Sequence, residues 1–128
     1  MTSGALILVV EDDPDIRESI QEILEDEGYR VATAFDGEDA LRCLRESARP
    51  DLILLDLLMP RMNAREFRDV QLLDAAWSRI PTVIMSADFH YDEKARELGA
   101  AAGVAKPVAL DDLLAVVRAC LGAGPIRA

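Results

Sequence analysis

The chain has 128 residues, which is enough for one domain with a sizeable core and too few for two. Its 24 acidic and 14 basic residues give a formal net charge of -10, which argues against nucleic acid or an anionic membrane as a direct partner and suits binding of a cation or a basic surface. The sequence shows no secretory signal or membrane-spanning apolar run, and Cys43 and Cys120 lack metal-binding spacing, so we expect a cytoplasmic protein with reduced thiols.

Strand and helix patterns alternate through the first half of the chain. The apolar run Leu6–Val10 predicts a strand, and Asp13 then caps a helix that has proline at its first position. A weaker strand candidate, Arg30–Phe35, leads to a second helix opened by Asp36. The apolar face of the first helix is expected to consist of Ile16, Ile20, Ile23 and Leu24. In the second helix, Leu41 and Leu44 are expected to face inward.

The same alternation continues through the second half. The strand candidates are Leu52–Leu55, Thr82–Met85 and Ala101–Ala105. Between them we expect a third helix, at about 64–75, with an apolar face of Phe67, Val70 and Leu73, and a short polar fourth helix at 91–98. The fifth helix carries Leu113, Val116, Val117, Cys120 and Leu121.

This alternation predicts an α/β fold in three layers, a five-stranded parallel sheet with five helices on its two faces. Periodicity leaves the strand order open. We assign the folded domain to residues 5–121 and expect the Gly-rich segment 122–128 to be a flexible tail or the start of a linker.

Charged and hydroxyl side chains follow or end four of the predicted strands: Glu11, Asp12, Asp13, Asp56, Ser86 and Lys106. Because the carboxyl ends of parallel strands meet at one edge of a sheet, we expect these side chains to lie close together. Clustered carboxylates repel one another, and Mg²⁺, which prefers oxygen ligands, would relieve that repulsion together with the lysine. Carboxylates, Mg²⁺, a lysine and a hydroxyl suit phosphoryl transfer with an aspartate as nucleophile.

Other phosphoryl-transfer and cofactor motifs are absent from the sequence. It has no GxxxxGK[ST] loop, no GxGxxG after the first strand, and no GxSxG or Cys/His pair. His90 precedes a polar helix without a partner at metal-ligand spacing, and we interpret it as a surface histidine. The strand-end cluster is therefore the candidate site.

Four ordered motifs resemble the receiver domain of bacterial two-component response regulators. They are Val-Val-Glu11-Asp12-Asp13-Pro14, Asp56-Leu-Leu-Met59-Pro60-Arg-Met62, Ser86-Ala87 and Lys106-Pro107. The resemblance covers about residues 5–121 and implies a flavodoxin-like, doubly wound sheet of strand order 2-1-3-4-5. It also implies a cis peptide bond between Lys106 and Pro107.

The resemblance also implies a role for each site residue. Asp56 would accept the phosphoryl group, and Asp12, Asp56 and the backbone carbonyl of Leu58 would bind Mg²⁺ directly, with Glu11 acting through water. Lys106 would pair with the phosphoryl oxygens, and Ser86 would donate its hydroxyl to them. Asp13 is better interpreted as the cap of the first helix.

The implied phosphodonor is a sensor histidine kinase or a phosphotransfer protein, and the chain would catalyse only its own phosphorylation and dephosphorylation. Phosphorylation would repack a surface of the fourth helix, fifth strand and fifth helix. The output would reach a downstream protein or an output domain beyond residue 128, and pairing of two copies through the fourth and fifth helices remains open. We expect no direct nucleic acid or membrane binding by this domain.

The sequence departs from the family pattern at three positions. Gly103 stands where the family usually has Tyr or Phe, so aromatic rotation cannot carry the signal in the usual way. Ala64 replaces a usual glycine, and Asn63 beside it is expected to take the unusual backbone angles instead. Val108 replaces a usual phenylalanine. We also expect apolar Leu58, unable to orient an attacking water, to favour a long-lived phosphoryl group.

Two other functions compete with a phosphorylatable receiver. A pseudo-receiver would keep the fold as a constitutive interaction module, which Gly103 favours and the complete set of site residues disfavours. A phosphatase with an aspartate nucleophile would need a second aspartate two residues after Asp56, where this chain has Leu58.

Overall fold

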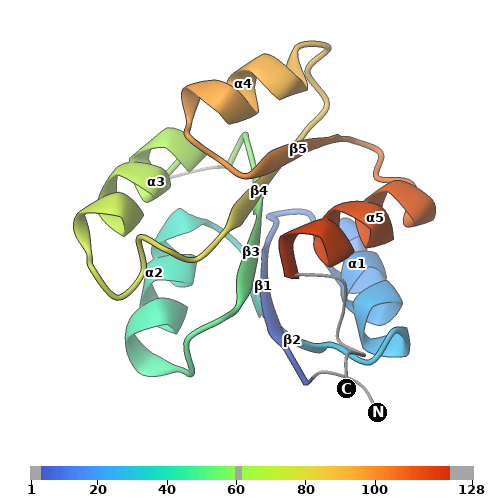
Figure 1. The fold of residues 1–128 in the computed structure, drawn as a ribbon, viewed down its shortest axis with the longest axis horizontal. Helices are drawn as coiled ribbons and strands as arrows, with labels where there is room; N and C mark the ends of the chain where they lie inside the picture. Colours follow the sequence, from blue (N-terminus) through green and yellow to red (C-terminus); the bar gives the residue numbers. More distant parts are fainter. Residues whose placement is uncertain (1–3, 60–61, 122–128) are drawn as a thin grey trace.

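The computed structural model describes residues 4–59 and 62–121, which form a three-layer α/β domain (Figure 1). The strands are β1 (Leu6–Val10), β2 (Arg30–Ala34), β3 (Leu52–Asp56), β4 (Thr82–Ser86) and β5 (Ala102–Ala105). The helices are α1 (Pro14–Asp26), α2 (Gly37–Glu46), α3 (Ala64–Leu73), α4 (Tyr91–Glu97) and α5 (Leu110–Leu121). The expected tail at 122–128 and Pro60 of the second motif lie outside the described residues.

All four strand pairings are parallel, and the sheet order is β2-β1-β3-β4-β5. This order and the five helices confirm the predicted fold. Strands β1, β3 and β4 are buried along their whole length, as their continuous apolar runs predicted. Among the described residues, no helix combines the length and apolar character that a membrane crossing requires.

The helices divide between the two faces of the sheet (Figure 1). Helices α1 and α5 cover one face, and their apolar side chains form one core cluster with residues such as Ile7, Leu54 and Met85. Helices α2, α3 and α4 lie on the other face, around a second cluster that contains Phe67 and Ile84. Because all four strand pairings are parallel, the carboxyl ends of the strands lie at the same edge of the sheet.

Side-chain caps fix where the helices begin. Asp13 accepts hydrogen bonds from the first-turn amides of α1, and Asp36 accepts one from Asp39 at the start of α2, both as predicted. Asn63 differs from the prediction. Its φ of -81° lies in the ordinary extended region, and its side chain forms a capping box with Glu66 at the start of α3. The loop after Asp56 therefore ends in a helix cap and not in a left-handed turn at Asn63.

The buried face of α3 also differs from the sequence prediction. Val70 is 36% exposed and Leu73 is 88% exposed, whereas Arg68 and Gln71 are 5% and 0% exposed. The polar pair turns inward and bonds to backbone carbonyls: Gln71 Nε2 donates to the carbonyls of Trp77 and Ile80. The guanidinium of Arg68 donates to Gln71 Oε1 over 2.8 Å, so the two side chains form one network.

The Arg68–Gln71 network leads to a prediction opposite to the one that hydrophobicity alone would give: the more apolar residue at position 71 should destabilise the protein. Gln71→Leu should lower the free energy of unfolding by about 2 kcal/mol, because it removes the acceptor of Arg68 Nη1 and one of the donors to each of the Trp77 and Ile80 carbonyls. Leu73→Gln, two residues away and exposed, should change it by less than about 0.5 kcal/mol. Urea denaturation of both variants measures the difference. If Gln71→Leu were stable and Leu73→Gln destabilised, the result would contradict the burial of Gln71 and the exposure of Leu73 seen in the structure.

Candidate functional site

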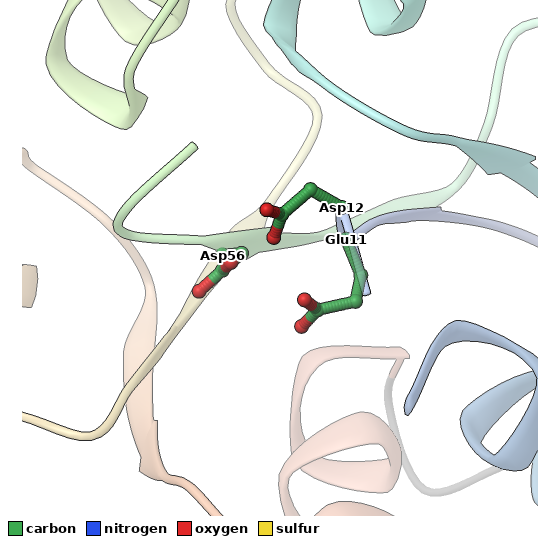
Figure 2. Close-up of side chains that lie close together, drawn as sticks. All are labelled: Glu11, Asp12 and Asp56. Atoms are coloured by element: carbon green, nitrogen blue, oxygen red, sulfur yellow. The ribbon is translucent and has the colours of Figure 1, made fainter. Parts of the chain in front are cut away.

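Three carboxylates meet at the carboxyl edge of the sheet (Figure 2). Glu11 and Asp12 directly follow β1, and Asp56 is the last residue of β3. Each offers an oxygen atom, and these oxygens lie within 4.8 Å of one another. The polypeptide brings them together because β1 and β3 are neighbouring parallel strands, with Val10 paired to Leu55.

Hydrogen bonds to both carboxylate oxygens and to the backbone carbonyl hold Glu11 in place. Its side chain is fully buried, and its Oε1 accepts a hydrogen bond from Lys106 Nζ over 3.0 Å. Its Oε2 accepts from the backbone amide of Asp13, and its backbone carbonyl accepts from Arg17 Nη1 over 2.8 Å. The sequence analysis did not identify Arg17 as part of the site. The one feature that could have indicated it is its positive charge near the start of the helix that follows the acidic pair.

Lys106 joins the two buried carboxylates. Its Nζ lies 3.0 Å from Glu11 Oε1 and 3.3 Å from Asp56 Oδ1, so one ammonium contacts both acids. Burial by itself would lower the pKa of Lys106, but its bond to Glu11 and the charge of Asp56 raise it above the ordinary value. The lysine therefore stays protonated at neutral pH and contributes a permanent positive charge to the site.

Ionisation of Asp56 is unfavourable at this buried position. Burial, followed by the nearby charge of Glu11, raises the pKa of Asp56 to about 7, although Lys106 acts in the opposite direction. The carboxylate is 4% exposed. A divalent cation between these acids would favour the ionised form, as any added positive charge would.

Ser86 lies at the same edge of the sheet, on the neighbouring strand β4. It ends β4, is 3% exposed, and its Oγ accepts a hydrogen bond from the backbone amide of Asp88 over 2.9 Å. The amide of Lys106 donates to the Ser86 carbonyl over 2.8 Å, which ties the end of β5 to the end of β4. The peptide bond that follows, between Lys106 and Pro107, is cis as expected.

The predicted site residues share one open cavity of about 250 Å³. It is lined by Glu11, Asp12, Asp56, Leu58, Ser86 and Lys106, together with Asp13, Ile16, Leu57 and Ala87. Asp13 uses its carboxylate to cap α1, in agreement with the role predicted for it. Leu58 is 77% exposed at the rim of the cavity. His90 stays on the surface, where its Nδ1 lies 2.9 Å from Glu93.

The donor set fits a hard divalent cation. The three groups of the cluster offer oxygen atoms, Asp12 is exposed to solvent, and Asp56 and Glu11 are buried behind it. Mg²⁺ takes one or two carboxylates and keeps several waters, which a cavity with one solvent-facing side can accommodate. The cluster therefore fits Mg²⁺ better than a metal that prefers nitrogen or sulfur ligands.

Comparison with known proteins gives a consistent result. A family described as the response regulator receiver domain matches residues 7–118. The response regulator MprA of Mycobacterium ulcerans is 38% identical over 117 residues, which cover 90% of this chain and 49% of that protein. The chain thus spans about half the length of the curated relatives it matches.

Solved structures agree in fold as well as sequence. The chemotaxis response regulator CheY4 of Vibrio cholerae aligns with a TM-score of 0.84 at 30% identity, over 91% of this chain and 98% of that one. The response regulator TrrA of Thermotoga maritima was solved in complex with Mg²⁺-BeF. It aligns with a TM-score of 0.80 at 31% identity, over 91% of this chain and 98% of that one. The matched family is the one that the sequence motifs predicted.

The raised pKa of Asp56 predicts how stability depends on pH. Between its ordinary value of 3.8 and about 7, the folded state holds a proton that the unfolded state has lost, so stability falls as pH rises through this window. Asp56→Asn removes this penalty. Without divalent cations at pH 8, its free energy of unfolding should exceed that of the wild type by on the order of 2 kcal/mol.

Chemical denaturation at pH 4 and pH 8, with and without Mg²⁺, measures this gap. The gap should shrink at pH 4, and it should shrink on adding Mg²⁺, because the cation stabilises the wild type more than the variant. Asp69→Asn, which changes an exposed acid on α3, is the matched control and should show no such pattern. Equal stability of wild type and Asp56→Asn at pH 8 would contradict the electrostatic description of the site.

Proposed function

Since the chain belongs to the response regulator receiver domain family, we propose that Asp56 accepts a phosphoryl group in a Mg²⁺-dependent reaction and that this switches a protein-interaction surface. The donor is a phosphohistidine on a sensor histidine kinase or a phosphotransfer protein. The observation that carries this proposal is the buried Asp56 carboxylate, which shares its cavity with Glu11, Asp12 and the Nζ of Lys106. The Mg²⁺-BeF complex of TrrA supports the choice of metal.

The residues suggest how the transfer would occur. An ionised oxygen of Asp56 attacks phosphorus, the bond between phosphorus and the donor imidazole nitrogen breaks, and the imidazole leaves with that electron pair. Mg²⁺, when bound by Asp12 and Asp56 and the Leu58 carbonyl, would supply positive charge for the phosphoryl oxygens. Lys106 already lies 3.3 Å from Asp56, where its ammonium can neutralise another of these oxygens.

Ser86 would be the residue that detects the new group. Its hydroxyl is buried at the end of the neighbouring strand and accepts a hydrogen bond from the Asp88 amide. A phosphoryl group adds strong acceptor oxygens, towards which the Ser86 hydroxyl can turn as a donor. The chemistry is confined to the chain's own phosphorylation and dephosphorylation, in a cytoplasmic setting. The output reaches a separate target protein or a further domain.

Phosphoryl uptake tests the proposal. Incubation with acetyl phosphate and Mg²⁺ should add one phosphoryl group by intact mass, while chelation of Mg²⁺ should abolish the product because the acidic pocket then lacks its cation. Asp56→Asn should gain no phosphoryl group, and the exposed control Asp69→Asn should behave as the wild type does. Failure of the wild type to react with either acetyl phosphate or beryllofluoride would favour a constitutive interaction module.

Leu58 generates a second prediction about the lifetime of the product. Its side chain is 77% exposed at the cavity rim and offers no group that could orient a water molecule. Leu58→Asn should therefore speed autodephosphorylation severalfold, because an amide can position the attacking water. Loss of phosphoprotein with time, followed by intact mass, gives the rate. Leu73→Asn, equally apolar and exposed on α3, is the control, and an unchanged rate for Leu58→Asn would refute this role.

A further inference from the structure

The Asp12 carboxylate differs from the other two acids of the cluster in how it is held. Among the residues that the structure describes, no hydrogen bond or ion pair reaches this carboxylate, which is exposed to solvent. Its oxygen nonetheless lies within 4.8 Å of oxygens of Glu11 and Asp56, whose like charges repel it (Figure 2). The place of the Asp12 carboxylate is therefore set by the backbone that carries it.

Three hydrogen bonds fix the backbone around Asp12. The Glu11 amide donates to the Ala34 carbonyl of β2 over 3.0 Å, and the Asp13 amide donates to Glu11 Oε2 over 3.1 Å. Between these two bonds, the peptide that joins Glu11 to Asp12 has its carbonyl bonded to Arg17 Nη1 over 2.8 Å. The orientation of the peptide that leads into Asp12 thus depends on a side chain of α1.

Arg17 stands at the end of the helix that is less favourable for a cation. It is in the first turn of α1, which begins at Pro14, and the N-terminal end of a helix carries partial positive charge. No carboxylate among the described residues forms an ion pair with its guanidinium, and the side chain is half-buried. Its Nη1 instead reaches back past the cap residue, Asp13, to the Glu11 carbonyl. A charged donor makes this a stronger hydrogen bond than a neutral one would be.

Loss of the Arg17 bond would affect one side of the cluster and spare the other. The plane of the peptide before Asp12 sets the direction of the Asp12 side chain, and a peptide free to rotate would let that side chain move away from the neighbouring negative charges. Asp56 does not depend on this peptide, because it is the last residue of β3 and its Oδ1 accepts from Lys106 Nζ over 3.3 Å.

We propose that Arg17 is the positioning residue for Asp12, and that its bond to the Glu11 carbonyl holds Asp12 in the place where it binds Mg²⁺. Arg17 thereby sets the affinity for Mg²⁺ without touching the cation, the phosphoryl group or Asp56. This inference rests on the proposed function, because it takes the acidic cluster as a Mg²⁺ site.

Magnesium titration of Arg17 variants tests this role. Arg17→Met keeps an unbranched apolar stem but has no donor, and Arg17→Gln has a donor on a shorter stem. Each should weaken Mg²⁺ binding about tenfold, measured by calorimetry and by the amide NMR signals of Asp12 and Asp56. Arg45→Met, at an exposed position on α2, is the matched control and should stay within about twofold of the wild type.

An unchanged Mg²⁺ affinity in a folded Arg17 variant would overturn the proposal. Two substitutions are used so that the test stands if one of them prevents folding. No Mg²⁺ response of Asp12 and Asp56 in the wild type would instead count against the proposed function, and this outcome is seen before any variant is made.

The rate of phosphorylation separates positioning of a ligand from general damage to the site. With acetyl phosphate as donor, the Mg²⁺ concentration that gives half the maximal rate should rise about tenfold in Arg17→Met, whereas the rate at saturating Mg²⁺ should stay within about twofold of the wild type. A lower rate at saturating Mg²⁺ with an unchanged half-saturating concentration would contradict a role through the cation.

A double-mutant cycle shows whether Arg17 acts through Asp12. Asp12→Asn already alters the ligand that Arg17 positions, so adding Arg17→Met to it should weaken Mg²⁺ binding by less than about twofold more. If the two substitutions instead weaken Mg²⁺ binding by the product of their separate effects, Arg17 acts independently of Asp12 and the proposal is wrong.

Discussion

The contact of one ammonium with two buried carboxylates is the constraint on which the site depends. Lys106 follows β5, Glu11 follows β1, and Asp56 ends β3, and the contacts of 3.0 Å and 3.3 Å connect elements up to 95 positions apart in sequence. Two acids with so little solvent would repel each other strongly without it. The lysine reduces the repulsion but does not remove it, since the pKa of Asp56 still rises to about 7. The remaining repulsion between the carboxylates is what a bound divalent cation would relieve.

The rest of the fold serves to place these three groups. Parallel pairing of β1 with β3 brings Glu11, Asp12 and Asp56 to one edge, and the helices on both faces keep the strands in register. Around Glu11, Arg17 and the Asp13 amide fix the backbone and the carboxylate. The site is therefore preorganised on strand ends, with its solvent-facing side left to Asp12 and Leu58.

The strands and the meeting of their charged ends at one edge were predictable from local patterns, whereas the order of the strands came only from the family resemblance. Continuous apolar runs mark buried parallel strands, and a charge that ends such a run must lie at the sheet edge. The face of α3 was mispredicted because the apolar spacing of Phe67, Val70 and Leu73 looked sufficient. The inward turn of Arg68 and Gln71 depends on carbonyls outside the helix, which the helical pattern does not reveal. Asn63 was mispredicted because its partner, Glu66, makes a helix cap more favourable than a left-handed turn.

The mispredicted face and the glycine in β5 belong to one part of the molecule. Helix α4 lies between them, bonded through Arg68 at one end and resting on Gly103 near the other. Asp88 connects the Ser86 hydroxyl with the residue before α4, since its amide donates to Ser86 Oγ and its Oδ1 accepts from the His90 amide. The chemistry proposed at Asp56 can be tested without reference to α4, which makes the acceptor residue itself the central claim.

That claim is tested most directly by locating the phosphoryl group. Borohydride reduces an aspartyl phosphate to homoserine, so the protein phosphorylated with acetyl phosphate and Mg²⁺ can be reduced, digested and sequenced by mass spectrometry. The account predicts homoserine at position 56 and aspartate at positions 12 and 13. Homoserine at another aspartate, or an unmodified Asp56 in protein that has gained a phosphoryl group, would contradict it.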